Sequence, residues 1–408
     1  MNITLQKSEI AKQSSIKITG SKSESNRLLL LKALYPEISL DNISNSDDSQ
    51  LMTKALDTSS NVIDIHHAGT AMRFLTAFFA IQEGREIVLT GSKRMKERPI
   101  KILVEALQDL GADISYVEND GFPPIKIKGK KLTKNKVNLK ANVSSQYISA
   151  LLLIASKLEN GLELTLEGKI TSIPYIKMTL SLLDEIGVES SFINNTITVK
   201  PNTQNQTPKT LTVESDWSSA SYYFSIVALS EIGTEITLSS YKENSLQGDS
   251  VLVDIYKDFG VSTTFNENSI TLKKENNCQL SIINCQLANA PDIAQTIAVT
   301  CFALGIECDL KGLHTLKIKE TDRLVALKTE IEKLGGKVDI TNDALYLHET
   351  DSIKQMVSVA TYHDHRMAMA FAPLALKTPI VIEEASVVSK SYPTFWSDLK
   401  SIGFKISE

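Results

Sequence analysis

The sequence lacks the features of a membrane or secreted protein. No apolar stretch in its 408 residues reaches the length that spans a bilayer without a polar interruption. The opening segment, MNITLQKSEIAK, contains no apolar core of the kind that a secretion signal requires. We therefore expect a cytoplasmic protein that makes no contact with a membrane.

The sequence also contains few cysteines, and its net charge is negative. The net charge of −5 argues against a nucleic-acid surface, although it is compatible with a local cationic pocket. The four cysteines have no two-residue spacing and lie in apolar or strand-like segments, which predicts buried free thiols rather than disulfides or a metal site. They are Cys278, Cys285, Cys301 and Cys308.

Two further kinds of site find no support in the sequence. A glycine-rich phosphate loop is absent, which argues against a P-loop kinase. The histidines of the HDH stretch, His363 and His365, have no carboxylate cluster at ligand spacing, so we predict no metal ion.

What the sequence does contain is a repeat within a chain that is long enough for two large cores, and hence for two domains. Five amphipathic helical segments end with a leucine, isoleucine or phenylalanine followed by glycine, the usual C-terminal cap of a helix. These glycines recur ~73 residues apart, which indicates a duplicated unit. They are Gly111, Gly187, Gly260, Gly335 and Gly403.

Each amphipathic segment has neighbours of two other kinds. Alternating runs such as VESSFINNTITVK follow four of the glycines and predict β-hairpins. A helical segment that is apolar nearly all round, such as SSQYISALLLIASKL, comes before and is typical of a domain core. SNRLLLLKAL is a shortened sixth copy. We therefore expect six units of strand, buried helix, strand, amphipathic helix and hairpin, with three units in each domain.

Polar residues recur at the expected N-terminus of each buried helix. The first such stretch, GSKSESNR from Gly20 to Arg27, puts serines and cations where a helix offers unpaired N–H groups to an anion. By itself it is read more simply as a serine cap with solvated charges. A second polar set lies in the loop before each amphipathic helix. Together the two sets predict helix N-termini that face a cleft shared by two domains and that attract anions.

Ten motifs between residues 20 and 393 carry a family resemblance: GSKSESNR, AGTAMR, RMKERPI, SSQY, SDWSSAS, QGD, PDIAQT, KETDRL, DHRMAM and SKSYP. With them the whole chain resembles the 5-enolpyruvylshikimate-3-phosphate synthases, which are enolpyruvyl transferases. The resemblance implies an α/β (α+β) fold of two globular domains, each of three βαβαββ units. The implied domains are 20–214, on the shikimate-phosphate side, and 215–408 with 1–19, which supplies acid and base residues, with a hinge near 20 and 214–216.

The resemblance also implies an activity. The enolpyruvyl group of phosphoenolpyruvate is transferred to the 5-hydroxyl of shikimate 3-phosphate, on the way to chorismate and aromatic amino acids, and inorganic phosphate is released. Addition followed by elimination needs a general base and a general acid, for which Asp292 and Glu320 are the candidates. Lys22 would neutralise the departing phosphate and is the rival proton donor. Asp216 and Asp249 fit helix caps as well as ligand contacts.

Both substrates carry a phosphate and a carboxylate, so their site needs several cations, among which arginines supply bidentate forks. For shikimate 3-phosphate the resemblance implies Lys22, Ser23, Arg27, Ser144, Ser145, Gln146, Ser172, Tyr175, Asp292 and Lys319. For phosphoenolpyruvate it implies Lys22, Gly69, Arg98, Gln146, Arg323, His365, Arg366 and Lys390. It implies no metal and no cofactor, and we expect a monomer.

Three positions depart from the family pattern. His67 and Phe74 stand where the motif around AGTAMR usually has asparagine and proline, and Thr315 stands where some members have asparagine. Gly69 is kept, so the phosphoenolpyruvate skeleton is expected to lie against bare backbone, and glyphosate is expected to compete for the same place.

Two alternative functions fit the residues less well. UDP-N-acetylglucosamine enolpyruvyl transferase has the same fold but uses a cysteine in the loop that corresponds to SKRMKERPI, and no cysteine precedes Cys278 here. A noncatalytic binding module of this fold would need degenerate acid and base positions, whereas Asp292 and Glu320 are both present.

Overall fold

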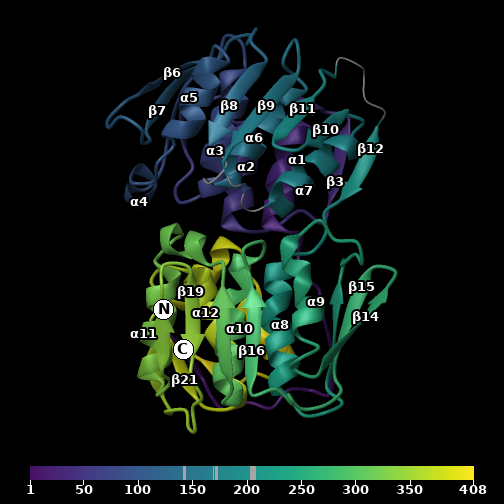
Figure 1. The fold of residues 1–408 in the computed structure, drawn as a ribbon, viewed down its shortest axis with the longest axis vertical. Helices are drawn as coiled ribbons and strands as arrows, with labels where there is room; N and C mark the ends of the chain where they lie inside the picture. Colours follow the sequence, from purple (N-terminus) through teal and green to yellow (C-terminus); the bar gives the residue numbers. More distant parts are fainter. Residues whose placement is uncertain (141–143, 169, 171–172, 203–207) are drawn as a thin grey trace. The chain divides into compact units, whose positions relative to one another are not determined.

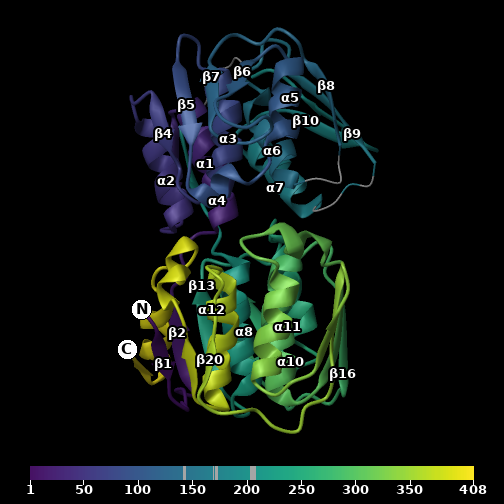
Figure 2. The ribbon, with the colours of Figure 1, turned by 90° about the vertical axis from the view of Figure 1, so that its left-hand side faces the viewer.

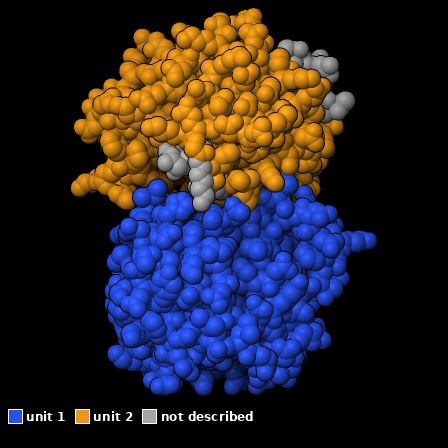
Figure 3. Space-filling model, in the orientation of Figure 1, with its two compact units in different colours: residues 1–19, 214–408 blue, residues 20–213 orange. Residues whose placement is uncertain are grey.

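The structure is a computed structural model that describes residues 1–140, 144–168, 170, 173–202 and 208–408. The chain forms two compact units, unit 1 (Met1–Thr19 with Glu214–Glu408) and unit 2 (Gly20–Val213), drawn in blue and orange in Figure 3. The expected division at 20–214 differs from this one by a single residue, Glu214. The hinge and the shared cleft stay predictions.

Unit 2 contains two complete repeats, with the sheet orders β4-β5-β7-β6 and β10-β11-β9-β8. In each repeat a buried helix joins two parallel strands, and an amphipathic helix then leads to an antiparallel hairpin. The first complete repeat consists of β4 (Val62–Asp64), α3 (Gly69–Ala80), β5 (Glu86–Thr90), α4 (Lys93–Lys96), α5 (Lys101–Asp109), β6 (Asp113–Tyr116) and β7 (Ile125–Lys128). Those of the second are β8 (Lys136–Lys140), α6 (Ser145–Ala155), β9 (Leu162–Glu167), α7 (Ile173–Glu185), β10 (Ser190–Ile193) and β11 (Thr196–Val199).

The first repeat of unit 2 is the shortened copy that the sequence predicts. It consists of α1 (Lys22–Leu34), β3 (Ile38–Asp41) and α2 (Asp47–Asp57), and β4 of the next repeat follows without a hairpin. Its second strand is supplied from the other end of the unit, because β12 (Lys209–Thr212) pairs with β3 in parallel.

Unit 1 contains three four-stranded sheets, with the orders β14-β15-β13-β2, β16-β17-β19-β18 and β20-β21-β1-β22. The first repeat has β2 (Gln13–Ile16), α8 (Trp217–Leu229), β13 (Glu235–Ser239), η1 (Gly248–Val251), α9 (Leu252–Ile255), β14 (Val261–Asn266) and β15 (Ser269–Lys274). The second has β16 (Ile282–Gln286), η2 (Pro291–Ile293), α10 (Ala294–Leu304), β17 (Glu307–Lys311), η3 (His314–Ile318), α11 (Arg323–Lys333), β18 (Val338–Ile340) and β19 (Ala344–Leu347). The third has β20 (Val357–Val359), α12 (His365–Phe371), η4 (Ala372–Leu376), β21 (Ile380–Ile382), η5 (Ala385–Lys390), α13 (Phe395–Ile402), β22 (Ile406–Ser407) and β1 (Ile3–Leu5).

The chain crosses twice between the units, and each crossing exchanges a strand. In the complete repeats the strand before a buried helix pairs in parallel with the strand after it. Strand β2 precedes α1 but pairs with β13, while β12 precedes α8 but pairs with β3. The N-terminal strand β1 completes the last repeat by pairing with β21 and β22, so both ends of the chain belong to one sheet of unit 1.

The buried helices form the core of each unit because most of the residues that they bury are apolar. All twelve residues of α3 are buried, whereas α5 buries one stripe and exposes the rest. Helices α1, α3 and α6 pack on one another in unit 2, and in unit 1 α10 packs against both α8 and α12 (Figures 1 and 2). The five predicted helix-ending glycines all have positive φ, from +76 to +120°. Four of them lie within two residues of the ends of α5, α7, α11 and α13, which confirms the cap there. The expected helix end at Gly260 is wrong, because α9 ends at Ile255 and Gly260 closes a turn. None of the described helices is long and apolar enough to span a membrane.

Candidate active site

In unit 1, polar side chains from five helix starts meet. They are Ser218 in α8, Asp249 in η1, Asp292 in η2, Arg323 in α11 and Arg366 in α12. Arg366 Nη2 donates to Ser218 Oγ at 3.2 Å and lies 3.4 Å from Asp292 Oδ2, while Arg323 Nη1 donates to Asp292 Oδ1 at 2.8 Å. Four of these helices follow a strand of their own repeat, whereas α8 follows β12 of unit 2, and the repeated unit brings their first turns together.

Arg323 lies at the centre of three carboxylates. Its Nε donates to Asp364 at 2.6 Å, its Nη1 to Asp292 at 2.8 Å and its Nη2 to Glu320 at 2.9 Å. The side chain is 2% exposed; burial alone would lower its pKa, but Asp364, Glu320 and Asp292 together raise it. The predicted contact between Arg323 and phosphoenolpyruvate stays a prediction, and a substrate anion would have to replace one of these carboxylates.

Asp292, the candidate base, is crowded by cations. Lys319 Nζ lies 3.4 Å from its carboxylate, and Arg366 and Arg323 are also close. Burial opposes the charge of Asp292, but Arg366, Lys319 and Arg323 outweigh burial and hold its pKa well below the usual range. An aspartate in this state is ionised but weakly basic, so it can take a proton from a hydroxyl only when its cations turn to another anion.

Asp249 is a second carboxylate of the cluster, and the sequence left its role open. It is 5% exposed and accepts a hydrogen bond from Ser218 Oγ. Burial and then the charge of Asp292 raise the pKa of Asp249 to about 6, against the opposing effects of Arg366 and the Ser218 hydroxyl. Asp216 caps α8 through its bond from Ser219 N at 2.8 Å, as a helix cap should.

His365 and Lys390, both predicted for phosphoenolpyruvate, adjoin a strained turn. His365 is 2% exposed and begins α12. Lys390 Nζ donates to the backbone oxygen of His363 at 2.7 Å. Tyr362 and His363 have φ of +54 and +56°, which side chains other than glycine rarely adopt. The turn delivers Asp364, the N-cap of α12, to Arg323.

In unit 2, Arg27 is enclosed by neutral partners. Its guanidinium donates to Thr179 Oγ1 at 2.8 Å, to Ser149 Oγ at 2.9 Å and to the backbone oxygen of Ser23 at 2.7 Å. It lies over the rings of Phe74 and Tyr175, with centroids at 5.4 and 5.8 Å. Burial lowers the pKa of Arg27 to about 10, so it stays charged at neutral pH. Its donors hold α1, α6 and α7 together, and contact with shikimate 3-phosphate stays a prediction.

Arg98 covers the first residue of α3. A Cβ atom on Gly69 would lie 2.5 Å from Arg98 Nη1 and 3.1 Å from its Cζ, so only glycine leaves room for this guanidinium. The space over Gly69, expected to hold the substrate skeleton, is therefore filled by the Arg98 side chain. Behind it, Arg73 is buried and donates to the backbone oxygens of Gly69 and Pro99, both at 3.1 Å. Burial and then Arg98 lower the pKa of Arg73 to about 10.

The other predicted residues of unit 2 lie at helix starts. Gln146 Nε2 donates to Thr70 Oγ1 at 3.2 Å and so joins the first turns of α6 and α3. Ser144 caps α6 and Ser145 is its first residue. Lys22 and Ser23 open α1, and Tyr175 lies in the first turn of α7. Ser172 falls outside the residues that the structure describes.

The family departures have distinct surroundings. Phe74 is fully buried beneath Arg27. The Nδ1 atoms of His66 and His67 are 3.1 Å apart, beside a hollow of about 360 Å³ lined by α2 and the two histidines. Thr315 Oγ1 is buried without a hydrogen-bond partner among the described residues.

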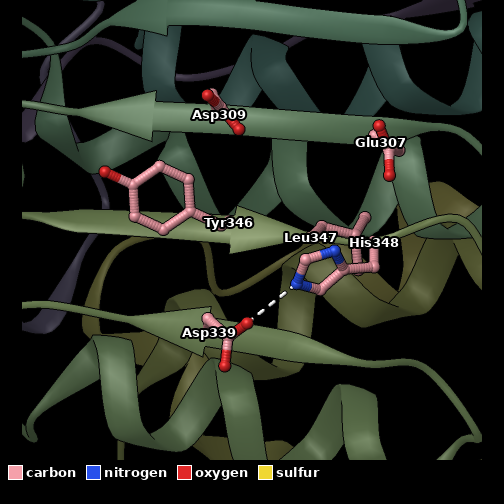
Figure 4. Close-up of a pocket in the computed structure, with 6 residues that line it drawn as sticks. All are labelled: Glu307, Asp309, Asp339, Tyr346, Leu347 and His348. Atoms are coloured by element: carbon pink, nitrogen blue, oxygen red, sulfur yellow. Dashed lines mark hydrogen bonds and ion pairs between the residues drawn. The ribbon is translucent and has the colours of Figure 1, made fainter.

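A second hollow, of about 270 Å³, lies on the sheet of β16, β17, β19 and β18 and contains none of the predicted site residues. Figure 4 shows Asp309, Tyr346 and Asp339 in one row across three strands, with His348 Nε2 at 2.8 Å from Asp339 and Glu307 nearby. Its three carboxylates would repel an anionic substrate. Among the described residues, no group of three or more His, Cys, Asp or Glu side chains is placed to hold a metal ion.

Sequence reasoning missed several partners of the predicted residues. Ser149 and Thr179 bind Arg27 from positions 122 and 152 residues away, and no local pattern marks them. Ser218 and Asp364 stood out as polar residues at helix starts, but the motifs alone did not connect them to Arg366 and Arg323.

Comparisons with known proteins agree with the family resemblance of the sequence motifs. The family model described as EPSP synthase (3-phosphoshikimate 1-carboxyvinyltransferase) matches residues 55–399. A 3-phosphoshikimate 1-carboxyvinyltransferase from Bacteroides fragilis is 47% identical over 399 residues, which cover 97% of this chain and 96% of that protein. One from Haemophilus influenzae is 35% identical, with 97% and 98% covered.

Solved structures share the fold. EPSP synthase from Acinetobacter baumannii superposes with a TM-score of 0.83 at 20% identity, with all of both chains covered. The enolpyruvyl transferase NikO from Streptomyces tendae superposes with a TM-score of 0.74 at 12% identity, over 100% of this chain and 98% of that one. The predicted fold class and family are thereby confirmed, and UDP-N-acetylglucosamine enolpyruvyl transferase is not supported. The chain belongs to the EPSP synthase family and is a transferase of the 3-phosphoshikimate 1-carboxyvinyltransferase type.

Proposed function

We propose that the chain transfers the enolpyruvyl group of phosphoenolpyruvate to the 5-hydroxyl of shikimate 3-phosphate and releases inorganic phosphate. The observation that carries the proposal is the pair of carboxylates, Asp292 and Glu320, bound to one guanidinium, that of Arg323. Two carboxylates held close together in different surroundings are suited to the base and the acid that addition and elimination require.

In the addition step, the 5-hydroxyl loses its proton to Asp292 while its oxygen attacks carbon 2, and carbon 3 gains a proton from Glu320. In the elimination step, carbon 3 returns a proton and the carbon–oxygen bond to phosphate breaks. The cations around Asp292 weaken it as a base, so we infer that substrate anions draw Lys319 and Arg366 away before the proton moves.

The cations of unit 2 support the same proposal. Arg98 rests on the first turn of α3, where unpaired backbone N–H groups also favour an anion, and described residues place no carboxylate within 4 Å of it. Lys22 likewise has no ion pair with a described residue, so its ammonium is available to a phosphate. We assign Arg98 to phosphoenolpyruvate and Lys22 to both substrates and the departing phosphate.

Phosphate release tests the proposal directly. The protein is incubated with phosphoenolpyruvate and either shikimate 3-phosphate or UDP-N-acetylglucosamine, with and without a metal chelator, and phosphate is followed continuously. We expect phosphate release when shikimate 3-phosphate is the acceptor and not when UDP-N-acetylglucosamine is, and we expect the chelator to have no effect. Phosphate release with the nucleotide sugar, or no release with either acceptor, would contradict the proposal. The monomeric state and the cytoplasmic location stay predictions, and size-exclusion chromatography with light scattering tests the first.

A further inference from the structure

The chain of contacts that holds Arg366 begins at a buried carboxylate without an assigned role. Asp249 is 5% exposed and accepts from Ser218 Oγ, and Ser218 Oγ in turn accepts from Arg366 Nη2 at 3.2 Å. On its other side Arg366 donates to the backbone oxygen of Asp292 at 3.1 Å and faces the Asp292 carboxylate at 3.4 Å. Arg366 is thus held between two carboxylates, one direct and one through a serine.

The charges around Asp249 disfavour its ionised form. Asp249 in η1 faces Asp216 at the start of α8, Asp292 in η2 and Arg366 in α12. The like charges of Asp292 and Asp216 oppose the charged form of Asp249, whereas Arg366 and the Ser218 hydroxyl favour it. A substrate anion that binds Arg366 brings further negative charge and offsets the positive charge of Arg366. Both effects favour the neutral form of Asp249.

We propose that Asp249 is a positioning residue for Arg366 and takes up a proton from solvent when an anionic substrate binds there. The pKa of Asp249, raised to about 6, supports this, because a small further rise protonates the group near neutral pH. The neutral carboxyl keeps its hydrogen bond with Ser218, so Arg366 keeps its place while the opposing charge is removed. The inference rests on the proposed function, since it assigns Arg366 to phosphoenolpyruvate.

The test is the KM for phosphoenolpyruvate, with saturating shikimate 3-phosphate, between about pH 5 and about pH 8.5. Asp249→Asn has the shape of the protonated carboxyl. We therefore expect it to match the wild type near pH 5, where Asp249 is already neutral, and to bind more tightly above pH 6, with KM about tenfold lower near pH 8. A side chain with only a structural role would raise KM, or lower kcat, at every pH. Titration of the substrate phosphate is the same for both proteins and cancels in their ratio.

Two further variants sharpen the test. Ser218→Ala removes a hydrogen bond that favours the charged form of Asp249, so the pH at which KM rises should move upward. Asp254→Asn removes one negative charge from α9, where Asp254 is exposed and paired with Lys257, and should leave the profile unchanged. Thermal melting checks that each variant is folded.

Calorimetry separates this inference from the proposed function. Phosphoenolpyruvate is titrated alone, without turnover, into wild type and Asp249→Asn in buffers of different ionisation heat near pH 7. Proton uptake by the wild type that Asp249→Asn abolishes supports the inference, even if no phosphate release is found. Equal uptake by both proteins, or a KM ratio independent of pH, overturns it.

Discussion

Replacing Gly69 by alanine tests whether Arg98 binds the substrate from its position against Gly69, the first residue of α3. The new Cβ would lie 2.5 Å from Arg98 Nη1 and 3.2 Å from Nη2. The nearest atoms belong to the end of a flexible side chain and not to backbone, so the guanidinium can retreat. It must move by about 1 Å to reach an ordinary contact near 3.5 Å. We therefore expect the fold to survive and the binding site to change.

The magnitudes of the two effects differ. The helix tolerates alanine at its first residue, so the free energy of unfolding should change by less than about 1 kcal/mol. A guanidinium moved by about 1 Å loses the geometry of a charge-assisted hydrogen bond, which contributes roughly 1.5–3 kcal/mol. We expect Gly69→Ala to raise the KM for phosphoenolpyruvate by about 10- to 100-fold, with little change in the KM for shikimate 3-phosphate.

A double-mutant cycle isolates the contact between the two side chains. KM is measured for wild type, Gly69→Ala, Arg98→Gln and the double variant, and urea denaturation gives the free energy of unfolding of each. In the Arg98→Gln background the added methyl group has no guanidinium to displace, so Gly69→Ala should change KM by less than about twofold. If the full effect persists there, or if Gly69→Ala loses about 3 kcal/mol or more of stability, the reasoning is wrong.

Further predictions concern a buried lysine and the two carboxylates. Lys274 Nζ is buried against two backbone oxygens at 2.7 and 2.8 Å, and burial lowers its pKa from 10.5 to about 8. At pH values between about 8 and 10.5 the unfolded chain therefore binds more protons than the folded chain. The free energy of unfolding should rise with pH above about 8, by at most about 1 kcal/mol per pH unit. Urea denaturation should show a weaker dependence on pH for Lys274→Met. Glu320→Gln should stop the incorporation of deuterium at carbon 3 in heavy water. If Glu320→Gln still incorporates deuterium and Lys22→Met does not, Lys22 is the acid. Asp292→Asn should lower kcat by roughly two to four orders of magnitude while the affinity for shikimate 3-phosphate changes little, and a large loss of that affinity would indicate a binding role instead.

The repeat could be read from the sequence because its signals are local. An apolar residue followed by glycine at the end of an amphipathic segment is a local signal for the end of a helix, and the hairpins and wholly buried helices follow from the spacing of apolar residues over a few turns. The predicted hairpins appear as β10–β11, β14–β15 and β18–β19. The ordered motifs were enough to indicate the family as well.

Pairing between the repeats was decided by the tertiary structure. The sequence predicts a strand before each buried helix but cannot say which strand it joins, because the exchange of β2 and β12 depends on where the chain crosses between units. Register and partner are set by long-range packing, which no local pattern encodes.

The same limit applied to the site. The family motifs marked Arg98 and Arg323 as cations for a substrate, and the resemblance said nothing of their partners in this chain. Only the packed structure puts Arg98 on the bare backbone of Gly69 and surrounds Arg323 with three carboxylates. A side chain's charge belongs to the sequence, but its partners and its pKa depend on burial and on neighbours that lie far away along the chain.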